Sequence, residues 1–124
     1  MKNKAIVAAA VLVAVFLIGF LPQFLKANRA ERELHQLRQK VADSELRDLA
    51  CLAYLQASQK NFGLASETAG RFFGKVREVA AGRKAVEDLA SSRDKLTAEL
   101  ARGDAAAIGD LQDLALRARA ATGY

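Results

Sequence analysis

The sequence predicts an all-α protein with a single N-terminal transmembrane helix, a charged helical stalk and a small antiparallel four-helix bundle. Three observations lead to this prediction. Residues 5–21 contain no charged or strongly polar side chain. After residue 25, apolar residues recur at spacings of three and four, which is typical of amphipathic helices. The same region has no β-branched residues alternating with polar ones, so strands are not expected.

The first element is the apolar segment within residues 1–25. At about 1.5 Å of rise per residue, a helix over residues 5–25 is roughly 30 Å long, which matches the hydrocarbon core of a bilayer. A cleaved signal peptide is the alternative, and such peptides end at a site of small residues. The residues after the apolar run, Leu21 to Lys26, are mostly bulky. We therefore predict a retained signal-anchor, with cleavage as the alternative.

The orientation of this anchor depends on two conflicting signals. Lys2 and Lys4 precede the apolar run, and a short basic segment in that place is usual for export of the domain after the run. Five basic residues after the run favour a cytoplasmic C-terminal domain instead, and these are Lys26, Arg29, Arg32, Arg38 and Lys40. We expect a bundle exported to the periplasm or another extracytoplasmic space, because the N-terminal arrangement is the usual one for export.

The formal net charge of +5 is concentrated beside the anchor. Residues 1–40 contain seven basic and two acidic residues, whereas residues 41–124 contain twelve of each. The basic excess can therefore contact anionic lipid headgroups. The rest of the chain has no basic excess of its own, so nucleic acid is not an expected partner.

Residues 26–43 form the predicted stalk. Leu34, Leu37 and Val41 are spaced by three and four residues and form a narrow seam of the kind found in coiled coils. These residues are candidate contacts for a protein partner, and the seam also makes a homo-oligomer a candidate. The seam is short, so the membrane helix or the bundle would have to support such an oligomer.

The bundle domain is predicted at residues 44–124, with Asp43 or Ser44 capping its first helix. Successive helices with short connections are antiparallel neighbours. Gly82 and Gly103 mark the ends of the second and third helices. The apolar spacing places the four segments at about residues 44–59, 62–79, 86–100 and 104–118.

A short stack of αα hairpins is the alternative architecture. The first two segments resemble one tetratricopeptide-like hairpin in the placing of Leu52, Ala53, Asn61, Phe62, Ala65, Ala69 and Phe72. The third and fourth segments do not repeat this spacing, which favours the bundle.

Three residues of the predicted bundle are candidate contact sites. Gly70 and Gly74 lie four apart inside the second helix, where each costs about 1 kcal/mol relative to alanine. They are either tolerated weak points or a place where a partner helix approaches closely. Arg93 interrupts the apolar spacing of the third segment. Its side chain can extend outward to solvent, pair with a buried acid, or bind an anionic ligand or partner.

No group of residues points to catalysis, a metal or a cofactor. The single histidine, His35, lies in the charged stalk and is expected to be solvated. The single cysteine, Cys51, lies among leucines and alanines and is expected to be buried as a small apolar residue. One histidine and one cysteine cannot form a zinc site of the usual composition. We therefore do not expect an enzyme.

The combination of anchor, stalk and bundle predicts a membrane-anchored interaction or scaffold protein, such as a small subunit of a membrane or envelope complex. The layout is similar to that of small single-span envelope proteins with coiled-coil stalks, such as the division-complex family. A ligand-sensing bundle tethered to the membrane is the alternative, because helical bundles can hold small molecules between their helices.

Overall fold

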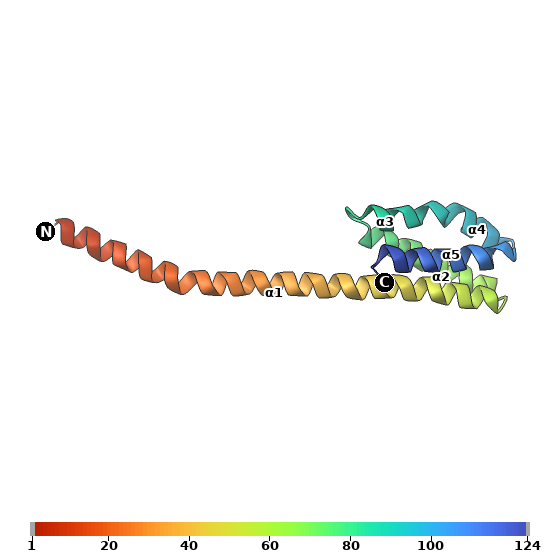
Figure 1. The fold of residues 1–124 in the computed structure, drawn as a ribbon, viewed down its shortest axis with the longest axis horizontal. Helices are drawn as coiled ribbons and strands as arrows, with labels where there is room; N and C mark the ends of the chain where they lie inside the picture. The colour runs from red at the N-terminus through yellow and green to blue at the C-terminus, as the bar shows by residue number, and fades with distance from the viewer. Residues whose placement is uncertain (1, 124) are drawn as a thin grey trace. The chain divides into compact units, whose positions relative to one another are not determined.

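The computed structural model describes residues 2–123, and this part of the chain is helical with no strand. The prediction of an all-α protein is therefore confirmed. The chain divides into two compact units, residues 1–38 and residues 39–124. The first unit contains only helix α1, whereas the second contains the end of α1 and all the later helices (Figure 1).

Helix α1 runs from Lys2 to Ser58 and continues through Pro22. It also continues through Asp43 and Ser44, where the loss of the apolar seam suggested that a new helix begins. The Asp43 side chain does not cap a helix. Its carboxylate accepts two hydrogen bonds from the Arg83 guanidinium, at 2.7 and 3.1 Å. Asp43 therefore holds the turn before α3 and does not end α1.

Helix α2 covers Phe62–Val79, the range that the apolar spacing predicted. Lys60 has a positive φ of 62° in the turn before it, and the Asn61 side chain accepts a hydrogen bond from the backbone N–H of Leu64. Gly82 has a φ of 73° just after the helix, a conformation that glycine adopts without steric cost.

The third segment differs from the single helix that was expected. It consists of α3 (Lys84–Glu87), the 3₁₀ helix η1 (Asp88–Ser92) and α4 (Arg93–Ala101). The Ser91 hydroxyl donates to the backbone carbonyl of Asp88 within η1. Short polar side chains of this kind compete with the backbone hydrogen bonds of an α-helix, which accounts for the tighter winding.

Helix α5 covers Ala106–Ala121 and is entered through Gly103 and Asp104. The Asp104 carboxylate accepts a hydrogen bond of 3.0 Å from the backbone N–H of Ala106, as expected for a residue that precedes a helix. The third segment contacts both α2 and α5, so these helices enclose a common core.

The core of the second unit is rich in alanine and leucine, with Phe72 as its largest fully buried side chain. Small residues let neighbouring helices approach closely, and the larger ones fill the remaining space. The fully or almost fully buried apolar residues include Leu46, Ala50, Ala53, Ala57, Ala65, Phe72, Val76, Val86, Leu89, Leu96, Leu100, Ala107, Leu111, Leu114 and Ala118.

Candidate functional site

A cavity of about 330 Å³ lies between α2 and the segment formed by α3, η1 and the start of α4. Its floor is apolar and includes Phe73, Val76 and Ala90. Phe73 is held by an edge-to-face contact with Phe72, with ring centroids 5.1 Å apart. The cavity therefore borders the core, and three charged side chains also line it: Arg77, Glu87 and Arg93.

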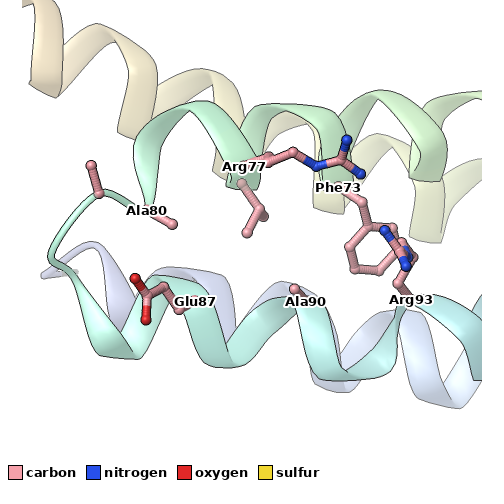
Figure 2. A pocket seen from close by; sticks show the side chains of 8 residues that line it. Phe73, Arg77, Ala80, Glu87, Ala90 and Arg93 are labelled. Atoms are coloured by element: carbon pink, nitrogen blue, oxygen red, sulfur yellow. The ribbon is translucent and has the colours of Figure 1, made fainter.

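The two ends of this cavity differ in charge. Figure 2 shows the guanidinium groups of Arg77 and Arg93 near Phe73, whereas Glu87 lies toward Ala80. Among the described residues, Arg77 forms no salt bridge, and Arg93 has only a 3.4 Å contact with the neighbouring Asp94. Two arginines without a strong acidic partner, beside an apolar floor, can bind a carboxylate or phosphate group.

Of the alternatives given for Arg93, the structure agrees with a side chain that extends outward to solvent. Its side chain is half exposed, and it lies at the edge of the cavity and not in the core. Arg77 and Glu87 were not predicted from the sequence. Arg77 follows Phe73 by one helical turn, and this spacing could have indicated that the two side chains lie on the same face of the helix. Glu87 could not be placed because the winding of η1 changes the direction of the side chains around it.

Gly70 and Gly74 both lie on the exposed side of α2. A Cβ atom added to either glycine would have no neighbouring atom within 4 Å. Gly74 also lines a second hollow of about 490 Å³ on the surface between α1 and α2. A Lys75–Glu45 salt bridge of 2.8 Å closes one side of that hollow, and its hydrogen bond raises the pKa of Lys75. Contacts within the chain therefore do not require these glycines.

Replacing Gly70 or Gly74 with alanine is expected to raise the free energy of unfolding by about 1 kcal/mol each, because alanine loses less backbone entropy in a helix. Urea unfolding of the full chain in detergent micelles, followed by circular dichroism, measures this change. Gly82→Ala is the opposite control, since its positive φ should make the same substitution destabilising. Destabilisation by Gly70→Ala would contradict the open space that the structure shows around this glycine.

Glu99 on α4 and Asp110 on α5 form a coupled pair of carboxyl groups. Burial, followed by the interaction with Asp110, raises the pKa of Glu99, and the hydrogen bond with Glu99 lowers the pKa of Asp110. Among the described residues, no group donates a hydrogen bond to the buried Glu99 Oε2. When Glu99 is protonated, its carboxyl O–H can donate a hydrogen bond to Asp110. Lys95 Nζ forms a salt bridge of 3.3 Å with Asp110 Oδ2, which favours the ionised form of Asp110.

Glu99→Gln is expected to stabilise the protein at neutral and higher pH, and to have little effect in acid. The pKa of Glu99 is higher in the folded state than in the unfolded state. Protonated Glu99 therefore contributes fully to the free energy of unfolding below the unfolded-state pKa, and this contribution is lost as the pH rises through the folded-state pKa. Glutamine donates to Asp110 at every pH. Urea unfolding at several pH values measures the difference, and the exposed Glu67→Gln is the control. A pH-independent difference would contradict the shared proton.

The predicted seam residues of the stalk and His35 lie on exposed parts of α1, whereas Asp43 at the end of the stalk is buried. Leu34, Leu37 and Val41 are about half exposed, and His35 is exposed as expected. Cys51 is also exposed, so the prediction that it is buried is wrong. The core-facing residues of α1 are Leu46, Ala50, Ala53 and Ala57, and Cys51 lies on the other side of the helix. Because leucines and alanines flank Cys51 on both sides in the sequence, their positions did not indicate which face of the helix is buried.

Among residues 2–123, α1 is the one helix with an apolar window long enough to cross a membrane. An 18-residue window of α1 has a mean hydropathy of 2.8, and none of it is buried. The same residues contain no cluster of three or more side chains that could hold a metal ion. No protein-family model, curated protein sequence or solved structure matches the chain.

Proposed function

We propose that this chain is a membrane-anchored, non-catalytic interaction protein, in which α1 tethers an antiparallel four-helix bundle to the bilayer. The observation that supports it most directly is the apolar window of α1, which no other part of the described chain covers. Exposed apolar surface costs about 25 cal/mol per Å² in water, so a window of this length favours a lipid environment.

The interaction part of the proposal rests on the cavity between α2 and η1. Arg77 and Arg93 offer guanidinium groups beside an apolar floor, which suits an acidic side chain or chain terminus of a protein partner. Such a partner fits a small subunit of a membrane or envelope complex. The bundle has no excess charge to attract nucleic acid.

We propose that the bundle lies on the extracytoplasmic side, because Lys2 and Lys4 precede the apolar run in the order that is usual for export. A C-terminal reporter that is active on only one side of the membrane tests this orientation in cells. Activity outside the cytoplasm supports it. Activity only in the cytoplasm would show that the basic residues after the apolar run determine the orientation.

A photo-crosslinking amino acid at Ala90 tests the cavity as a partner site in the full chain in its membrane. We expect a defined crosslinked protein from position 90 and none from Ala120, an exposed position on α5. Combining Arg77→Gln with Arg93→Gln should reduce the crosslink strongly, whereas Arg119→Gln should not. Equal crosslinking from both positions, or none from position 90, would contradict the proposed partner site.

A ligand-sensing bundle is the second candidate, and the size of the cavity favours it. A volume of about 330 Å³ lies within the range of small-molecule sites. A thermal-shift screen of the detergent-solubilised chain with small carboxylates and phosphates tests this function. Stabilisation that disappears with Arg77→Gln would support it, and no stabilisation by any of these compounds would exclude this class of ligand.

A further inference from the structure

Helix α1 carries a second pattern in the stalk, which is visible when the seam is numbered as a heptad repeat. With Leu34 at position a, Leu37 is at d and the alanines at 27 and 30 occupy the preceding a and d positions. All four residues lie in α1 and are exposed, with Leu34 and Leu37 at 48% and 58%. The first unit therefore has an unpartnered apolar seam.

The charged residues that flank this seam are arranged for pairing with an identical helix. In a parallel coiled coil, position g of one helix lies beside position e of the next heptad in its partner. Lys26 at g then faces Glu31 at e, and Glu33 at g faces Arg38 at e. Both pairs join opposite charges, and each occurs twice in a symmetric dimer.

Within the described chain, no salt bridge is formed by Lys26, Glu31, Glu33 or Arg38. In the second unit, by contrast, Lys75 and Arg83 each form one. The next heptad keeps only part of the pattern, with Lys40 at g and Val41 at a, because Glu45 at e is paired with Lys75 of α2. It then ends, because Ser44 and Asp48 occupy the following d and a positions.

We propose that residues 26–38 bind the same segment of a second copy of this chain in a parallel, in-register coiled coil. The parallel direction rests on the proposed membrane anchor, because two copies inserted in the same way leave the bilayer in the same direction. A seam of fewer than two heptads is too short to hold a dimer in solution. Confinement to one membrane raises the local concentration of the two segments and offsets this weakness.

Disulfide formation in native membranes tests the register. In a Cys51→Ser background, Leu34→Cys and Leu37→Cys are each expected to give a covalent dimer on mild oxidation, since a and d positions face their own copies. Gln36→Cys, on the outward side of the same helix, should give none. Dimers from all three positions would indicate random collision and overturn the register, and no dimer from any of them would contradict the proposal.

Charge reversal tests the flanking pairs in the Leu34→Cys background. Glu33→Lys places two positive charges together in each pair, and Arg38→Glu places two negative ones together. Either change alone should lower the association constant roughly tenfold. Co-expression of the Glu33→Lys and Arg38→Glu chains, with different tags, should restore a mixed dimer, whereas an unrestored mixed dimer would contradict the pairing.

Membrane fractionation in the same experiment separates this proposal from the proposed function. A chain that sediments with membranes but gives no position-34 dimer would contradict self-association and leave the anchor in place. A chain found in the soluble fraction would contradict the anchor itself, and with it the parallel direction. Co-expression of the Leu34→Cys and Leu37→Cys chains tests the direction. A covalent dimer that forms only between these two chains would indicate the antiparallel arrangement and overturn the proposal.

Discussion

Phe72→Ala is expected to lower the free energy of unfolding of the second unit by about 3–5 kcal/mol. Phe72 is fully buried and is the largest such side chain in the core. Its removal loses apolar burial and leaves a cavity in the core, beside Phe73. Because small domains have modest stability, a loss of this size should leave much of the protein unfolded.

Urea unfolding of the full chain in detergent micelles, followed by circular dichroism, measures this effect. Leu116→Ala is the matched control, because Leu116 is 60% exposed and should change the stability by less than about 0.5 kcal/mol. Phe72→Leu should give an intermediate loss. Equal effects of Phe72→Ala and Leu116→Ala would mean that Phe72 is not in the core of the folded protein.

Arg83→Ala is expected to lower the free energy of unfolding by about 3 kcal/mol, which is the second largest effect. The substitution leaves the Asp43 carboxylate, which is only 12% exposed, without the guanidinium that donates two hydrogen bonds to it. A charge that is mostly removed from water and unpaired carries its full desolvation cost.

The double variant Asp43→Leu with Arg83→Met should recover most of this loss, because it removes both charges and keeps apolar volume. Asp113→Ala is the exposed control, since the Asp113–Arg117 contact of 3.9 Å lies at the surface and should contribute less than about 1 kcal/mol. A double variant as unstable as Arg83→Ala would show that the pair contributes through its geometry and not through the burial of charge.

The sequence predicted helices best where the period of apolar residues and a stop signal agree. Helix α2 has both, in the spacing from Phe62 to Val79 and in the left-handed Gly82. In the third segment, apolar residues recur at helical spacing, but the chain does not form one regular α-helix. Ser91 forms a local hydrogen bond, which the apolar spacing does not reveal. The uninterrupted α1 was missed because Asp43 pairs with a residue 40 positions away.

The candidate site could be predicted only in part. Arg93 was identifiable as a charge within an apolar repeat, but its cavity depends on Arg77 and Glu87 from other elements. Local periodicity does not show which faces of two helices meet. Cys51 illustrates the same limit, since a run of leucines and alanines leaves several faces of a helix equally apolar.

Two long-range contacts lie in the first turns of the second unit. Asp43 is joined to Arg83, and the Arg47 guanidinium donates a 2.9 Å hydrogen bond to the Thr122 hydroxyl near the end of the chain. A pulling force that enters this unit through its N-terminal residues meets the Asp43–Arg83 pair before Leu46, the first core residue, and the Arg47 hydrogen bond directly after it. Each must rupture before the helix can peel away. The bundle is therefore reinforced at the place where a membrane tether would transmit mechanical load.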